Sequence, residues 1–205
     1  MKATKTLALT LLVGLASSLS GQGFLGESYG EASLGYAKLK EGNFRPDGWG
    51  LGAAVNFPAL DVAQGVGIDF RLDAGYVRLS EGGASARALG AGLTVPFFIE
   101  TGPGIRPFLA PNGGVVRARS GGVRDTSGFI GLTGGVELEV SPEIYVTPTI
   151  DYNYDTDDSV KTWSYGIEGA YNFAPQYALF LGYEYSDVRR AGSGYTIFGG
   201  MRMRF

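Results

Sequence analysis

Charged side chains recur at every second position inside apolar stretches of this chain. Asp69, Arg71 and Asp73 alternate with Ile68, Phe70 and Leu72, and Glu137 and Glu139 are spaced in the same way. Residues two apart lie on one face of an extended strand, so these charges share a surface with few apolar neighbours. We expect a network of ion pairs inside the fold, since buried charges must pair or stay hydrated. Its predicted members are Glu31, Asp69, Arg71, Asp73, Glu137, Glu139, Asp151, Glu168, Glu184, Arg202 and Arg204.

The chain has few residues of the types that usually carry out catalysis. The chain has no His and no Cys, which removes the commonest general base, thiolate nucleophiles and most metal ligands. Glu137 and Glu139 could act only as a carboxylate pair, and acid–base work needs environments that drive two pKa values apart. We therefore predict no enzyme activity, no cofactor and no metal site.

Two loop regions could bind ions. The segment 155–159 is dense in oxygen ligands but lacks the Gly and terminal Glu of an EF-hand loop, so a solvated hairpin tip is favoured over a calcium site. Arginines near the predicted outer end could pair with lipopolysaccharide phosphates, or form a solvated loop surface. They are Arg117, Arg119, Arg124, Arg189 and Arg190.

The elements that must position these residues are strands, because the apolar period is two from Tyr29 onward. In 161–173, Trp163, Tyr165 and Ile167 alternate with small or polar residues. The predicted strands cover 28–39, 48–58, 66–79, 86–99, 105–117, 128–140, 144–157, 161–173, 177–186 and 194–205. An eight-stranded count stays open, since Pro96, Pro107 and Pro111 interrupt two segments.

Connections of two kinds alternate between these strands. Four are short, at 59–65, 100–104, 141–143 and 174–176, and the others are mostly longer and more charged, at 40–47, 80–85, 118–127, 155–160 and 187–193. Short periplasmic turns and longer outer loops are typical of outer-membrane barrels.

The first residues have the layout of a secretory signal peptide. Lys2 and Lys5 precede an apolar run over 7–15 and then small residues, and the run is too short to span a bilayer as a helix. We assign 1–21 to a cleaved signal peptide and 22–205 to one barrel domain. The mature chain would hold 15 basic and 20 acidic side chains, a net charge of −5, which disfavours nucleic acid as a partner.

The size of the side chains on the two faces indicates whether the apolar face points inward or outward. Many Gly residues lie on the polar face, as a narrow lumen requires, whereas the opposite face carries Trp, Tyr, Phe and Leu. We predict an all-β, closed antiparallel up-and-down transmembrane barrel of about ten strands, with the bulky face in lipid. A soluble ligand-binding barrel, with this face inward, is the alternative.

The last strand is the most specific motif. Tyr195, Ile197, Met201, Met203 and Phe205 alternate with Thr196, Arg202 and Arg204, which resembles the C-terminal signature of bacterial outer-membrane proteins. The resemblance implies recognition by the barrel-assembly machinery and residence in the outer membrane. By its whole-chain pattern the sequence is similar to the small OmpA-like and opacity-type barrels.

These observations predict a structural or surface-interaction role, with a lumen mostly filled by side chains and outer-membrane lipid, lipopolysaccharide and an unspecified surface ligand as partners. A narrow cation-preferring porin is the alternative function.

Overall fold

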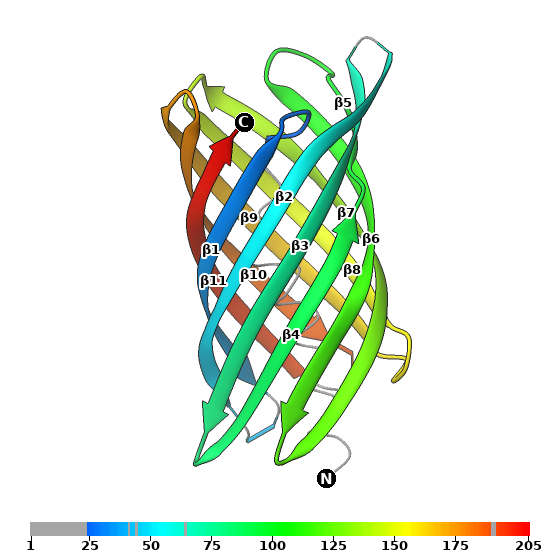
Figure 1. Ribbon diagram of the computed structural model, residues 1–205, viewed down its shortest axis with the longest axis vertical. Helices are drawn as coiled ribbons and strands as arrows, with labels where there is room; N and C mark the ends of the chain where they lie inside the picture. Colours follow the sequence, from blue (N-terminus) through cyan, green and yellow to red (C-terminus); the bar gives the residue numbers. More distant parts are fainter. Residues whose placement is uncertain (1–23, 41, 44, 64, 190–191) are drawn as a thin grey trace.

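One sheet makes up the fold and closes on itself (Figure 1). The computed structural model describes residues 24–205 except 41, 44, 64, 190 and 191. The predicted signal peptide and Arg190 lie outside the described residues. Among the described residues, the structure contains no helix with the length and apolar character needed to cross a membrane.

The strands follow one another around the barrel in antiparallel order, and the pairings β1–β11 and β2–β3 complete the circle. Their bounds are β1 Tyr29–Lys40, β2 Asp47–Ala63, β3 Val66–Glu81, β4 Ala84–Thr94, β5 Phe97–Ile99, β6 Ile105–Ser120, β7 Val123–Ser141, β8 Ile144–Asp155, β9 Lys161–Ala174, β10 Tyr177–Val188 and β11 Gly192–Arg204.

Strands β4 and β5 occupy one position, between β3 and β6. They are separated at Val95 and Pro96, because proline has no N–H to give to the ladder. The backbone stays bonded across the break, since Val95 N–H donates to the Pro111 carbonyl and Asp69 N–H to the Pro96 carbonyl, both at 2.9 Å. The barrel therefore has ten strand positions, which confirms the ten-stranded prediction over the eight-stranded one.

The barrel has two ends, which we call proximal and distal. The proximal end holds residues 24–28 and Phe205, whose N–H donates to the Ser28 carbonyl at 3.2 Å. The distal end, at the bottom of Figure 1, holds the β3–β4 and β6–β7 turns.

Those two distal connections are tighter than predicted. The strands run on to Gly82–Gly83 and Gly121–Gly122, which all have positive φ between 55° and 85°. Two successive residues with positive φ form the turn that best suits the twist of a two-residue hairpin. The predicted longer loops 80–85 and 118–127 are thus hairpin ends, and β6 and β7 are longer than the predicted strands 105–117 and 128–140.

The two faces of the sheet differ as the alternation predicts. Large apolar side chains cover the outer face, including Leu181, which is 66% exposed, Trp163 and Tyr165. The inner face, however, carries aromatic rings as well as Gly and charge. Each of five inward Phe rings lies opposite a Gly on the next strand, in the direct partners Phe98–Gly67, Phe108–Gly135, Phe129–Gly114, Phe180–Gly200 and Phe198–Gly182. A Cβ at Gly182 would lie 2.2 Å from Phe198 Cζ, so the ring occupies the room that the missing side chain leaves.

Candidate functional site

A buried cluster of four charged residues crosses the lumen. Glu31 of β1 bonds Arg71 of β3 at 3.3 Å and Arg202 of β11 at 2.7 Å. Arg202 also reaches Glu168 of β9 at 2.8 Å. Glu31 and Arg202 are direct cross-strand partners, which explains their short contact. The cluster joins four strands through side chains that are at most 5% exposed.

Aromatic rings surround the two arginines of this cluster. The Arg202 guanidinium lies 4.4 Å from the centre of the Phe180 ring and 5.1 Å from that of Phe24. Arg71 donates to the Tyr29 hydroxyl at 2.5 Å and lies over the same ring at 5.7 Å. Cation–π contacts of this kind, together with the ion pairs, compensate for the loss of water around a buried charge.

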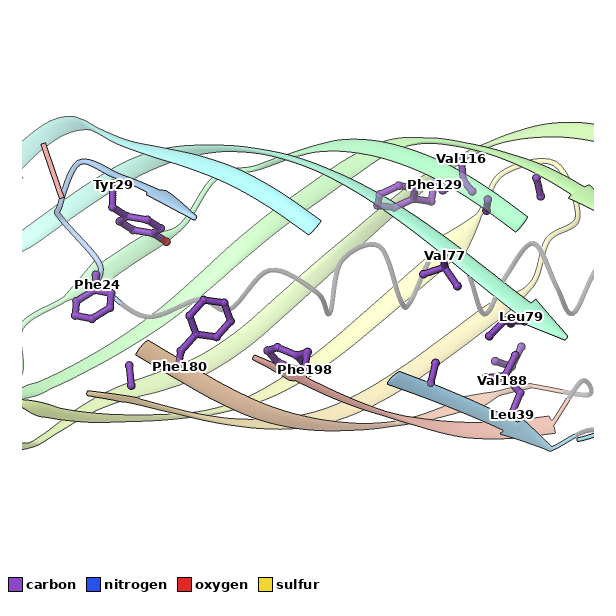
Figure 2. Close-up of a cluster of buried hydrophobic side chains, with 14 of the residues drawn as sticks. Phe24, Tyr29, Leu39, Val77, Leu79, Val116, Phe129, Phe180, Val188 and Phe198 are labelled. Atoms are coloured by element: carbon purple, nitrogen blue, oxygen red, sulfur yellow. The ribbon is translucent and has the colours of Figure 1, made fainter. Parts of the chain in front are cut away.

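Residues 24–28 enter the proximal end and bond to the lumenal carboxylates. Glu137 accepts the N–H groups of Phe24 and Leu25, and Asp69 accepts that of Gly26 at 2.9 Å. Asn56 donates to the Glu27 carbonyl at 2.8 Å. Figure 2 shows the Phe24 and Tyr29 rings together at one end of the buried cluster.

Two further arginines hold this segment in place. Arg106 pairs with Glu137 at 3.2 Å and donates to the Leu25 carbonyl at 2.6 Å. Arg204 pairs with Glu27, donates to Asn172 at 3.1 Å, and lies 4.2 Å from the centre of the Phe24 ring. The chain entry and the lumenal charges therefore form one connected assembly.

The other predicted network members lie elsewhere. Asp151 accepts a hydrogen bond from Thr133, and Glu184 accepts one from Ser186 at 3.1 Å. Asp73 is half-buried on the inward face of β3. Glu139 was predicted in the network but is exposed, because it lies near the proximal end of β7, which ends at Ser141.

Arg106 is not among the predicted members of the network. The missed signal is the alternation itself, since Arg106 shares its face of β6 with the buried Phe108 and Ala110. Phe24 precedes the first strand, so no period could have placed its ring in the lumen.

The distal part of the lumen contains an apolar group beside buried polar side chains such as Ser127 and Asp155. Leu39, Leu79 and Val188 are each no more than 2% exposed, and Figure 2 shows them together at the end away from Phe24. The prediction of Gly and charge in the lumen is therefore incomplete, because large apolar side chains share its distal part with polar ones.

The acidic hairpin 155–160 is organised by its own first residue. Asp155 accepts hydrogen bonds from the N–H groups of Asp157 and Asp158, at 2.9 and 3.0 Å, and from Ser127 at 2.7 Å. A carboxylate that accepts backbone N–H groups one turn ahead stabilises a tight loop. Among the described residues, no group of three or more His, Cys, Asp or Glu is arranged to hold a metal ion.

The predicted lipopolysaccharide contacts separate into two places. Arg117, Arg119 and Arg124 are exposed on the outer wall of β6 and β7, and Arg189 is exposed in the β10–β11 connection. The predicted assembly signal follows the outer face of β11, with Ile197, Met201, Met203 and Phe205 exposed and Tyr195 half-buried.

A closed ten-stranded up-and-down barrel with an apolar outer wall is the architecture of outer-membrane β-barrels. Solved structures of this class are similar to the chain. Neisserial surface protein A matches with a TM-score of 0.50 and 16% identity, over 87% of this chain and 97% of that chain. An outer-membrane channel from Pseudomonas putida F1 matches with a TM-score of 0.58 and 9% identity, over 91% of this chain and 100% of that chain. The β-domain of the Bordetella autotransporter BrkA matches with a TM-score of 0.52 and 13% identity, over 87% of this chain and 100% of that chain. No protein family and no curated protein matches the sequence. At these identities the likeness concerns the fold.

Proposed function

We propose that this protein is a closed outer-membrane barrel with a structural or surface-interaction role, whose lumen is mostly filled by side chains. The observation that carries the proposal is the cluster of Glu31, Arg71, Arg202 and Glu168, because its ion pairs span the lumen from four strands. An ion would have to break these desolvated pairs to pass.

Both ends of the lumen support closure. At the proximal end, residues 24–28 are held by backbone and side-chain bonds to Glu137 and Asp69. Toward the distal end, Leu39, Leu79 and Val188 fill part of the lumen with apolar side chains, which disfavour hydrated ions.

Planar-bilayer conductance of the refolded chain starting at residue 22 tests the proposal. A matched variant, Arg202→Ser with Phe180→Ala and Phe198→Ala, removes three side chains from the lumen and serves as the positive control for insertion. We expect steady current steps from the variant and none from the native sequence. Robust cation-selective steps from the native sequence would overturn closure.

That contrary result would favour the second candidate, a narrow cation-preferring pore. Its supporting observation is the series of carboxylates Asp151, Asp155 and Glu184 on the inner face of β8 and β10, toward the distal side of Arg71 and Arg202.

Outer-membrane lipid is the expected surrounding of the apolar wall, and lipopolysaccharide is the proposed partner at the distal end. The barrel-assembly machinery is the proposed partner of Tyr195, Ile197, Met201, Met203 and Phe205 during biogenesis. The proposal includes no enzyme activity. Export through a cleaved signal peptide is part of it, and cell fractionation tests the placement, since release with periplasmic contents would instead favour a soluble ligand-binding barrel.

A further inference from the structure

Four arginines on neighbouring strands form a continuous row on the outer wall near the distal end. Arg78 of β3 is the direct cross-strand partner of Arg87 of β4. Arg87 is in turn the partner of Arg119 of β6, and Arg119 is the partner of Arg124 of β7. We call these four residues the arginine row. Strands in a sheet are about 4.8 Å apart, so the row extends over about 14 Å.

The row lies on the lipid side of the wall. Val77 and Leu79, which flank Arg78, face inward and are buried. Ala88, next to Arg87 on β4, and Ala118, next to Arg119 on β6, are buried on the inner face in the same way. The direct partner of Arg78 on the other side is Trp49, which is 45% exposed and packs on Tyr76 with ring centres 5.7 Å apart. Trp and Tyr side chains of this kind lie at the depth of lipid headgroups. The arginine row therefore lies beside Trp49 and Tyr76, at headgroup depth.

No carboxylate in the described part of the chain forms an ion pair with the arginine row. The five ion pairs found there, made by Arg71, Arg106, Arg202 and Arg204, do not include the row. The carboxylates nearest in sequence, Glu81 and Asp125, are odd-numbered on β3 and β7 and alternate toward the inner face. Like charges directly opposite each other destabilise a sheet, so the fold bears a cost here unless an anion binds.

The surface at the row is hollowed. A depression of about 570 Å³ lies between the ends of the β3–β4 and β6–β7 hairpins and is lined by Tyr76, Arg78, Arg87 and Arg119. A second depression of about 340 Å³ beside it is lined by Arg87, Leu89, Arg117 and Arg124. Arg117 is the direct partner of Leu89, so a fifth guanidinium lies next to an apolar side chain. The combination of guanidinium groups and apolar surface suits a phosphate attached to an acyl chain.

We propose that the arginine row, with Arg117, binds the phosphate groups of an outer-leaflet lipid that carries more than one phosphate, of the lipid A class. The inference rests on the membrane placement in the proposed function and adds the binding site to it. It moves the centre of the predicted lipopolysaccharide contact from the loops to the outer wall of β3, β4, β6 and β7.

Lipid binding by two charge-matched variants tests this. The row variant is Arg78→Gln, Arg87→Gln, Arg119→Gln and Arg124→Gln, and the control variant is Lys38→Gln, Lys40→Gln, Arg45→Gln and Arg189→Gln, which removes four distal charges elsewhere. The probes are purified lipid A, enzymatically dephosphorylated lipid A and inorganic phosphate, each titrated against the detergent-folded native chain and both variants.

We expect the row variant to bind lipid A at least about tenfold more weakly, because each exposed charge-assisted contact contributes a factor of about two to five. The control variant should stay within about twofold of the native chain, since removing distant exposed charges changes little. Equal lipid A affinity of the native chain and the row variant, or an equal loss in the control variant, overturns the site. Full displacement of lipid A by inorganic phosphate would assign the row to free phosphate and overturn the lipid.

Folding is measured separately, by the mobility of unheated samples on a denaturing gel. A row variant that keeps the compact mobility and loses lipid A binding supports the site. A native chain that stays closed in the bilayer assay but fails to bind lipid A refutes the site alone, whereas loss of compact mobility in the native chain would refute the barrel in the proposed function.

Discussion

Replacing Arg202 with Met should destabilise the barrel more than any single exposed substitution. Arg202 is 1% exposed, pairs with Glu31 at 2.7 Å and Glu168 at 2.8 Å, and lies 4.4 Å from the Phe180 ring centre. Met keeps much of the volume but leaves Glu168 buried without a cation. Breaking one side of a buried ion pair costs about 3–5 kcal/mol, and we expect that loss in the free energy of unfolding.

A double-mutant cycle with Glu168→Gln separates the ion pair from general packing. Each single variant should lose stability, and the double variant should lose at least about 1 kcal/mol less than the sum, because its second substitution removes the orphaned charge. Arg45→Gln, an exposed distal residue, is the control and should change stability by no more than about 0.5 kcal/mol.

Urea unfolding in lipid vesicles, followed by tryptophan emission and by gel mobility of unheated samples, gives the free energies. Two results would refute the reasoning. One is an Arg202→Met loss no larger than that of Arg45→Gln, and the other is strict additivity in the cycle, since either would mean that the buried pair contributes nothing specific.

Two further predictions concern the inner wall and the acidic hairpin. Gly182→Ala should lower the free energy of unfolding in urea by about 1–3 kcal/mol, because its Cβ would lie 2.2 Å from the Phe198 ring. Gly169→Ala is the control and should be tolerated, since no atom lies within 4 Å of its added Cβ. Equal losses in the two variants would contradict the packing of rings against glycines. Partial burial and the carboxylates of Asp155, Asp125 and Asp157 raise the pKa of Asp158 above its ordinary value of 3.8. Ionisation of this carboxyl therefore disfavours the fold, and the folded state loses stability as pH rises through the raised pKa. Asp158→Asn should therefore raise the thermal midpoint at pH 7 and leave it unchanged well below pH 3.8, and a gain that persists in acid would contradict this assignment.

The alternation in the sequence was sufficient to predict the barrel, since side chains with a period of two have only two faces to occupy. It assigned Trp163 and Tyr165 outward and Glu31 and Arg202 inward, as the structure places them. The turns were predicted less well. Gly82–Gly83 and Gly121–Gly122 lie among polar residues that look like loops, although strand pairing continues up to each pair of glycines.

The candidate site could be predicted only in part, because alternation gives the face of a residue and not its neighbours across the lumen. Glu31 and Arg202 meet through the closure of β1 on β11, which brings together residues far apart in sequence. The arginine row has the same origin: Arg78 and Arg124 lie in different hairpins, and only the strand register aligns them.

The direction of the apolar face is the central claim, and the two tryptophans report it directly. Trp49 and Trp163 are the only tryptophans of the chain, and both are exposed on the outer wall, at 45% and 44%. In vesicles made with acyl-chain-brominated lipid, we predict strong quenching of their emission and weak quenching by iodide in the water. Strong iodide quenching without quenching by brominated lipid would place this face away from the bilayer and contradict the account.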